Sequence, residues 1–227
     1  PGVYLMKDAG GTVLYVGKAV SLRSRLRSYF VPNPRVTPRI LAMIQRVRDL
    51  ETLVCGTQLE ALILECNLIK RYQPRYNILL RDDKEYPYIR VTLNEAYPRV
   101  LKAFHIGPDA AEGARYYGPY PGGTLRDALE TLKRLFPMKT CRRVLPRDIG
   151  KERPCLNYHI GRCLGPCQGS VSRDAYLESI HAICRFLEGR TAGLREDLAR
   201  RMREASDAMA YEQAALFRDR LASLEIG

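Results

Sequence analysis

Apolar positions in the first third of the chain come in short runs and then recur at helical spacing. The short runs are rich in valine, leucine and tyrosine, with glycines between them that suit a hairpin turn. Ser21 is the expected N-cap of the first helix, and Pro74 ends the last one. The expected elements are strands at 2–6 and 12–17, a helix from 21 to about 30, a helix near 39–48, a strand near 51–57 and a helix over about 58–72.

The remainder of the chain changes from strands to turns and then to helices. Its pattern predicts strands within 86–104, a loop over 116–123 and a helix over 124–136. From Asp174 the pattern is helical, with a weaker apolar stripe near 209–210 that favours two antiparallel helices. We therefore expect an α+β protein in four parts: a domain with a short antiparallel sheet flanked by helices at 1–82, an α+β linker region at 83–136, a cysteine-rich connector at 137–172 and a helical region with a C-terminal hairpin at 173–227.

Composition and charge indicate a folded protein with a polyanionic partner. A content of 46% hydrophobic and 27% charged residues excludes a disordered tail, collagen and a coiled-coil rod. No stretch approaches the ~18 apolar residues that a membrane span requires, so no membrane association is expected. The net charge of +12 is concentrated in residues 1–90, at +7, and 133–173, at +8, whereas 174–227 carry −2. We expect nucleic acid to contact the two basic segments and a protein to contact the acidic one.

The seven cysteines and the N-terminal residues indicate the cellular compartment and the extent of the protein. No secretory signal is visible, so a cytoplasmic, reducing compartment is expected, where clustered cysteines bind metal more often than they form disulfides. The chain starts at Pro1 and not at a methionine, from which we expect part of a longer protein.

Phenols, cations and one carboxylate of the N-terminal third could converge on a single site. Side-chain alternation allows Tyr4 and Tyr15 to share one face of a hairpin. Lys18 follows Gly17, where the backbone can approach a ligand closely. The remaining candidates border apolar helix faces: Arg25, Tyr29 one turn after it, and Glu65 on the longer helix.

Such a set has a chemical logic for phosphodiester hydrolysis. A carboxylate can hold one divalent metal ion, and cations stabilise charge on phosphoryl oxygens. A phenol can act on water when nearby cations favour its deprotonated form. Spacing alone also allows tyrosines that belong to the sheet core and a glutamate that is merely solvated, so this alternative stays open here.

Four cysteines in the most basic block predict a metal centre. They are Cys141, Cys155, Cys163 and Cys167. Prolines and glycines around them allow turns that can bring several thiolates to one point. Zinc, with His159 as a further possible ligand, and an iron–sulfur cluster both fit the spacing, as does a set of reduced structural cysteines without metal. Basic residues around them could grip phosphates, or form a solvated loop: Arg142, Arg143, Arg147, Lys151, Arg153 and Arg162.

Several segments resemble a known nuclease family. Gly2-Val3-Tyr4 and Tyr15-Val16-Gly17 are similar to the two halves of the GIY-YIG signature, with valine in place of isoleucine in each. The stretches 64–70, 74–77, 84–88 and 117–120 and the cysteine region resemble the bacterial UvrC excinuclease family. Residues 211–219 resemble its UVR motif, which would lie at about 192–227. The likeness covers essentially the whole chain, so the first 82 residues are expected to be a GIY-YIG endonuclease domain.

The resemblance implies an endonuclease that cuts damaged double-stranded DNA 3′ to a lesion in nucleotide excision repair. It gives each candidate a role: Glu65 as the ligand of Mg²⁺ or Mn²⁺, Tyr4 and Tyr15 as the phenols near the water, Arg25 and Tyr29 at the scissile phosphate, Lys18 beside it, and Asn77 as a support. Which tyrosine is the base stays open. The DNA-contacting residues expected outside this set are Arg23, Arg27, Arg142, Arg143, Arg147, Lys151 and Arg153.

The resemblance also implies a cofactor and a protein partner. It favours a [4Fe–4S] cluster over zinc at the four cysteines. The UVR motif would pair with a similar hairpin of UvrB through Met202, Ala205, Glu212, Ala214, Phe217 and Leu221. The family's half that cuts on the 5′ side and its helix-hairpin-helix elements have no counterpart in this sequence, so one of two incisions is expected. The alternative is a non-catalytic DNA-binding adaptor stabilised by a zinc or iron–sulfur centre.

Overall fold

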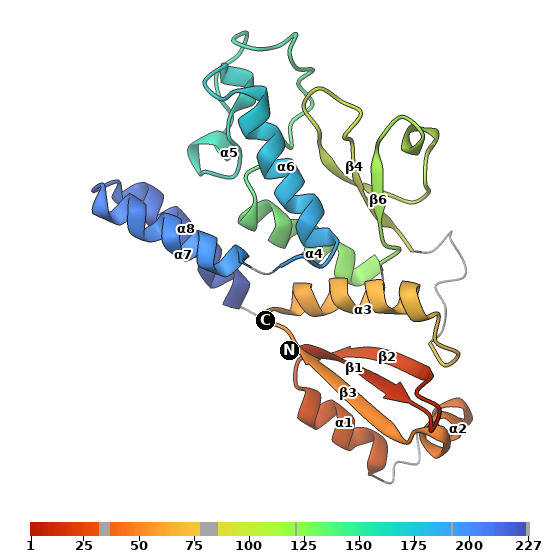
Figure 1. The fold of residues 1–227 in the computed structure, drawn as a ribbon. Coiled ribbons are helices and arrows are strands. Elements are labelled where there is room, and N and C mark those ends of the chain that lie inside the picture. The colour runs from red at the N-terminus through yellow and green to blue at the C-terminus, as the bar shows by residue number, and fades with distance from the viewer. Residues whose placement is uncertain (32–36, 78–85, 121, 192, 226–227) are drawn as a thin grey trace. The chain divides into compact units, whose positions relative to one another are not determined.

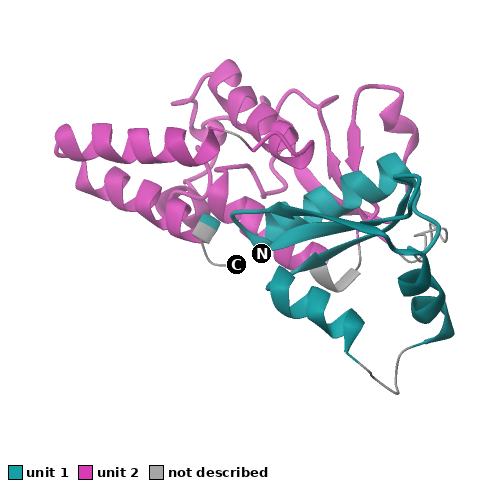
Figure 2. Cartoon of the chain, turned by 60° about the horizontal axis from the view of Figure 1, so that its bottom comes forward, with its two compact units in different colours: residues 1–81, 224–227 teal, residues 82–223 magenta. Residues whose placement is uncertain are grey.

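The computed structural model describes residues 1–31, 37–77, 86–120, 122–191 and 193–225. The chain divides into two compact units, residues 1–81 with 224–227 and residues 82–223 (Figure 2). No helix in the described ranges has the length and apolar character that a bilayer span needs. The α+β class is confirmed, and the four-part division at the predicted boundaries stays a prediction.

The first unit is built on a three-stranded antiparallel sheet. Its strands are β1 (Gly2–Lys7), β2 (Val13–Ala19) and β3 (Asp49–Val54), in the order β2-β1-β3. Helices α1 (Leu22–Phe30) and α2 (Pro38–Arg46) pack on one face around Tyr4, Met6 and Met43. Helix α3 (Gln58–Tyr72) packs on the other face, over Val3, Leu5 and Val16 (Figure 1). The sheet is therefore covered on both faces.

Side-chain caps fix where these helices begin. The hydroxyls of Ser21, Thr37 and Thr57 accept hydrogen bonds from the backbone N–H three residues on, at the starts of α1, α2 and α3. The predicted helices at 21–30 and 58–72 are confirmed. The strand expected near 51–57 instead spans Asp49–Val54, because Asp49 pairs with Lys7 and Thr57 is already committed to capping α3.

The second unit contains a smaller sheet covered by helices. Its strands are β4 (Tyr88–Val91), β5 (Val100–Ala103) and β6 (Arg115–Tyr117), in the order β5-β4-β6. The longer helices are α4 (Gly122–Leu135) and α6 (Arg173–Leu187); the short ones are α5 (Leu156–His159) and the 3₁₀ turns Pro108–Ala110 and Pro166–Gln168. The expected loop at 116–123 is wrong at both ends: Tyr116 pairs with Arg90 of β4, and α4 begins at Gly122.

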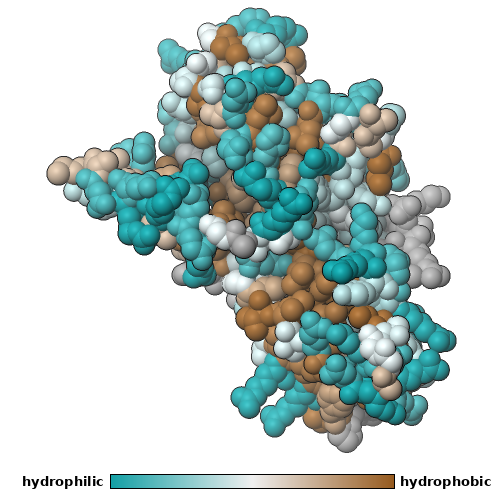
Figure 3. Space-filling model, in the orientation of Figure 1, coloured by the Kyte–Doolittle hydropathy of each residue, from teal (hydrophilic) through white to brown (hydrophobic). Residues whose placement is uncertain are grey.

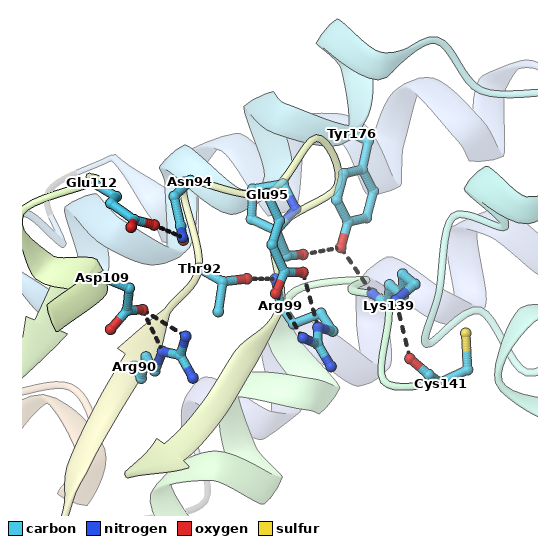
Figure 4. A network of polar contacts seen from close by, with 11 residues as sticks. Arg90, Thr92, Asn94, Glu95, Arg99, Asp109, Glu112, Lys139, Cys141 and Tyr176 are labelled. Atoms are coloured by element: carbon cyan, nitrogen blue, oxygen red, sulfur yellow. Dashed lines mark hydrogen bonds and ion pairs between the residues drawn. The ribbon is translucent and has the colours of Figure 1, made fainter. Parts of the chain in front are cut away.

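A polar network ties the sheet of this unit to the segment that enters the cysteine-rich region (Figure 4). The buried Tyr176 hydroxyl of α6 donates to the Pro98 carbonyl at 2.6 Å and accepts from the Lys139 backbone N–H at 3.2 Å. The Lys139 ammonium, in a residue only 4% exposed, donates to the Cys141 carbonyl at 3.0 Å. Three distant segments are thus joined at one hydroxyl.

The chain ends in a helical hairpin, as predicted. Helix α7 (Leu194–Asp207) and helix α8 (Tyr211–Glu225) are joined by a turn in which Met209 has a positive φ of 59°. Leu198 and Ala205 of α7 are buried, and the outer surface of this arm is mostly hydrophilic in the view of Figure 3. A charged outer face and a small apolar seam are what a paired helical hairpin requires.

Candidate active site

The phenols of the GIY-YIG-like segments lie together on the α1 side of the first sheet. Met6 pairs with Tyr15 and Tyr4 pairs with Gly17, so the two tyrosines are diagonal neighbours with ring centroids 6.0 Å apart. Tyr4 is fully buried, and its hydroxyl shares a 2.8 Å hydrogen bond with that of Tyr29. Arg25 completes the group: its Nε donates to the Tyr4 hydroxyl at 3.4 Å, and its guanidinium lies over the Tyr29 ring.

Gly17 makes this arrangement of rings possible. A Cβ at that position would lie 2.5 Å from the Tyr4 hydroxyl and 2.8 Å from the Tyr15 ring. The two aromatic side chains occupy the space where a side chain at this position would lie, and the approach of a ligand to the backbone at Gly17 stays a prediction. The glycine of the second motif therefore serves to position the phenols.

Burial keeps both phenols neutral in the absence of ligands. Desolvation, followed by the hydrogen bond with Tyr29, raises the pKa of Tyr4 far above its ordinary value, and Arg25 offsets part of this. Desolvation raises the pKa of Tyr15 to about 12, and the negative charge of Glu65 acts in the same direction. Tyr15 is partly exposed whereas Tyr4 is not, so Tyr15 is the phenol that solvent can reach.

Glu65 reaches the site around the edge of the sheet. It belongs to α3, on the face opposite the phenols, and its Oε1 accepts the backbone N–H of Lys18 on edge strand β2 at 3.0 Å. Desolvation raises the pKa of Glu65, and the Lys18 charge and N–H partly counter that effect. The carboxylate is thus bonded to the same strand that carries Tyr15, three residues before Lys18.

The outer edge of β2 is closed by residues just after α3. The Asn77 side chain pairs with Val16 twice, accepting from its N–H at 2.9 Å and donating to its carbonyl at 2.8 Å, while the Tyr76 N–H donates to the Leu14 carbonyl. Asn77 is buried and therefore supports the strand that carries Tyr15 and Lys18. Arg39, which the sequence did not single out, donates to the Asn77 carbonyl, and no motif marks it.

The structure thus brings the seven predicted residues into two adjoining groups. Tyr4, Tyr15, Arg25 and Tyr29 form one, and Lys18, Glu65 and Asn77 lie along the edge of β2. Arg23 and Arg27 of α1 are the flanking cations, and Arg23 is exposed. The catalytic and DNA-binding roles of all these residues stay predictions.

The cysteine-rich region gathers sulfurs and N–H donors. The Arg143 Nη1 donates to the Cys167 sulfur at 3.0 Å, the Gln168 amide donates to it at 3.4 Å, and the Gly165 N–H donates to the Cys163 sulfur. Desolvation raises the pKa of Cys163 to about 11, and the other three cysteines add to that shift. Among the described residues, however, no three Cys, His, Asp or Glu side chains stand close enough to share a metal ion. The four thiols do not form a ligand set in this conformation.

The predicted DNA-contacting residues of this region differ in exposure. The Arg147 and Lys151 side chains are 67% and 59% exposed, whereas the Arg143 side chain is only 16% exposed. Arg143 also bonds to Glu152 and to the Arg153 carbonyl. The Arg143 guanidinium therefore stabilises the loop and is largely withdrawn from solvent.

The predicted partner residues spread over both helices of the hairpin. Ala205 is buried, Glu212 is exposed, and the other four are half-buried: Met202, Ala214, Phe217 and Leu221. The half-buried set contains the apolar side chains that a second hairpin could cover.

Sequence comparisons assign these parts to one family. Residues 1–78 match the UvrC-like GIY-YIG domain, 86–186 match the middle domain of UvrC/Cho excinucleases, and 193–226 match the UvrB/uvrC motif. The chain belongs to the UvrC family. The match of all three segments in chain order explains why the phenols, the cysteine-rich region and the hairpin occur in one polypeptide.

Individual UvrC relatives match nearly the whole chain. The UvrABC system protein C of Acetivibrio thermocellus is 51% identical over 226 residues, and that of Ruminiclostridium cellulolyticum is 52% identical over 225. Each match covers 99% of this chain but 36% of the relative, so the chain spans about a third of the length of these curated relatives. A solved structure of the GIY-YIG N-terminal endonuclease domain of UvrC from Thermotoga maritima, bound to magnesium, is 46% identical over 34% of this chain and 83% of that chain, with a TM-score of 0.32.

Proposed function

We propose that this chain is a metal-dependent DNA endonuclease of nucleotide excision repair, which cuts damaged double-stranded DNA on the 3′ side of the lesion after delivery by UvrB. The observation that carries the proposal is the placement of Glu65 at the edge of β2, where its carboxylate accepts the Lys18 N–H at 3.0 Å on the strand that also carries Tyr15. Membership of the UvrC family supports it, as does the match of the first 78 residues to a GIY-YIG domain.

Glu65 is the residue that would hold Mg²⁺ or Mn²⁺. A single carboxylate suits Mg²⁺, which keeps several waters and is commonly bound by one or two carboxylates together with substrate phosphates. When bound, the ion would polarise the scissile phosphate and stabilise the leaving oxygen. The Lys18 N–H fixes one carboxylate oxygen, so the side chain is held in place before an ion arrives.

The remaining residues bind the phosphate and handle the proton. Arg25 carries a fixed positive charge beside the phenols and would stabilise charge on the phosphoryl oxygens, together with Lys18 on the edge of β2. Tyr4 is buried and bonded to Tyr29, so it would hold in place the hydroxyl that we assign to the phosphate. Tyr15 is the phenol we assign to the attacking water, because it is the one that solvent reaches.

Incision of lesion-bearing duplex DNA in the presence of UvrB and Mg²⁺ tests the assignment. Glu65→Gln should reduce the 3′ nicking rate by about a hundredfold or more, because it removes the charge that holds the ion. Glu60→Gln is the matched control on the same helix, since the Glu60 carboxylate accepts a hydrogen bond from the Gly56 N–H near the start of α3. Nicking by Glu65→Gln at the wild-type rate would favour the non-catalytic adaptor.

We also propose a [4Fe–4S] cluster, with zinc as the alternative, at Cys141, Cys155, Cys163 and Cys167. The donors to the Cys163 and Cys167 sulfurs support a thiolate centre, because N–H groups and a guanidinium stabilise charge on sulfur. The thiols would have to move together, since they do not form a ligand set as they stand. Anaerobic purification followed by iron, sulfide and zinc analysis decides between them: iron near about four per chain supports the cluster, and metal-free protein overturns both.

A further inference from the structure

Helix α8 of the hairpin packs on the cysteine-rich loop. Gly161 lies between Cys155 and Cys163 with a positive φ of 69°, and a Cβ there would stand 2.7 Å from the Leu216 Cδ2. One turn further along α8, the Arg220 Nη2 donates to the Gly161 carbonyl at 3.1 Å. Leu216 therefore occupies the space that a side chain at position 161 would need, and Arg220 bonds to the carbonyl of the same glycine.

Other contacts stabilise both the loop around Gly161 and the Arg220 side chain. The loop is braced by backbone hydrogen bonds from Gly161 to the Tyr158 carbonyl and from Cys163 to the Asn157 carbonyl. On the helix, the Arg220 guanidinium lies 5.5 Å from the centre of the Phe217 ring. Arg220 is half-buried at this contact, and burial lowers the pKa of its guanidinium. A desolvated arginine with a defined carbonyl partner marks a built interface.

The docked face of α8 differs from the face that carries the apolar residues expected to bind a partner. Leu216 and Arg220 are one turn apart on one face, which also carries Glu212 one turn earlier, whereas Ala214 and Leu221 lie roughly a third of a turn around the helix. Phe217 lies between the two faces and carries the Arg220 guanidinium. The loop therefore contacts α8 on a face other than the one that carries Ala214 and Leu221.

We infer that the loop between Cys155 and Cys163 is a docking surface for α8, and that the conformation of this loop sets the orientation in which the hairpin meets its partner. The second half of the inference rests on the proposed binding of UvrB; the first half does not.

Gly161→Ala tests the docking, with Gly150→Ala as its control. Gly150 has nearly the same backbone conformation, at φ 74°, but an added Cβ there meets nothing within 4 Å. Both variants carry the same backbone strain, so only the contact with Leu216 differs. Hydrogen exchange of the α8 amides should accelerate about tenfold in Gly161→Ala and stay within about twofold of wild type in Gly150→Ala. Equal exchange in the two variants would overturn the docking surface.

Two further comparisons distinguish loss of the contact between α8 and the loop from a general loss of stability. Leu216→Ala should remove the overlap that Gly161→Ala creates. The free-energy change derived from α8 amide exchange in the double variant should therefore be smaller than the sum of the changes in the two single variants. Arg220→Ala should accelerate α8 exchange, whereas Arg218→Ala, which removes an exposed arginine that pairs with Asp219, should not. Additive effects, or equal effects of the two arginines, would contradict the assigned contact.

Binding of UvrB to the full chain tests the orientation claim. Gly161→Ala should weaken UvrB binding about tenfold while Gly150→Ala leaves it unchanged. If exchange responds but UvrB affinity does not, the orientation claim is wrong. If the wild-type chain does not bind UvrB at all, the proposed partner is wrong, and hydrogen exchange still decides the docking surface.

Discussion

Single residues around the phenols are constrained both by contact distances and by electrostatics. Gly17 is the clearest case, since both tyrosine rings occupy the space above it. Glu65 is another, because a partly buried carboxylate is retained at an electrostatic cost. Both features indicate that the arrangement of the site limits which residues these positions can hold.

Gly17→Ala should destabilise the first unit by about 1–3 kcal/mol, because the new methyl group would overlap the Tyr4 hydroxyl and the Tyr15 ring. Gly10→Ala is the control, since a Cβ there would meet only the Asp8 carboxylate at an ordinary 3.4 Å. Denaturant unfolding of the two variants measures the difference. Equal stability of the two would show that the rings move aside at little cost.

Glu65→Gln should raise the melting temperature at pH 8 in metal-free buffer and leave it unchanged at pH 4. Burial raises the Glu65 pKa above its usual 4.5, so the folded chain holds this proton more tightly than the unfolded chain does. The favourable contribution of the protonated carboxyl is present below the unfolded pKa and is lost as pH rises through the folded pKa. A melting temperature at pH 8 below that of the wild type would contradict the sign of this shift.

At the level of secondary structure, the edge of β2 links the two halves of the site. Strand register puts Tyr15 on one face, while Glu65, Asn77 and Tyr76 close the outer edge. An edge strand normally offers unpaired backbone groups to other chains. Here the backbone groups of β2 bond to the Glu65 carboxylate and the Asn77 side chain. The same hydrogen bonds therefore protect the edge and position residues of the site.

Asn77→Ala should destabilise the first unit by about 2–3 kcal/mol, since it leaves the Val16 N–H and carbonyl without this partner in a buried position. Thermal or denaturant unfolding without metal measures the effect, which separates support of β2 from a direct role in catalysis. The control is Asn94→Ala, at an exposed position in the second unit. A stable Asn77→Ala variant would mean that another group closes the edge.

Local patterns predicted the elements better than the links between them. Ser21, the expected N-cap, marks a real helix start because a hydroxyl three residues before an N–H is a local signal, whereas Thr57, expected at the end of a strand, caps α3. The pairing of Asn77 with Val16 spans 61 residues, and the contact of Leu216 with Gly161 likewise joins distant segments. Such contacts depend on tertiary packing, which periodicity does not encode. Helical spacing supplied Glu65 as a candidate and the family motif supplied Asn77, but neither indicated the edge of β2 as the place where they meet.

Across the whole molecule, positive charge is divided between residues that face solvent and residues that hold the cysteine-rich loop. Arg142 and Arg143 are neighbours in sequence, yet Arg142 is exposed and Arg143 bonds to the Cys167 sulfur. A net charge of +12 therefore overstates the number of cations available to DNA.

Arg142→Ala should reduce the slope of log binding constant against log salt for duplex DNA by about 0.9, the loss of one phosphate contact. Arg143→Ala should leave that slope unchanged and instead lower the stability of the second unit, because it removes the contacts with Cys167 and the Arg153 carbonyl. Fluorescence anisotropy over a salt series distinguishes them. The same slope change in both variants would show that Arg143 reaches DNA.

The claim that Glu65, at the edge of β2, holds the catalytic ion is tested most directly by titrating the full chain with Mn²⁺ and following the free ion by electron paramagnetic resonance. We expect one Mn²⁺ site in the wild type and in Glu60→Gln, with affinity weakened at least about tenfold in Glu65→Gln. Undiminished binding in Glu65→Gln would place the ion elsewhere and contradict the proposed site.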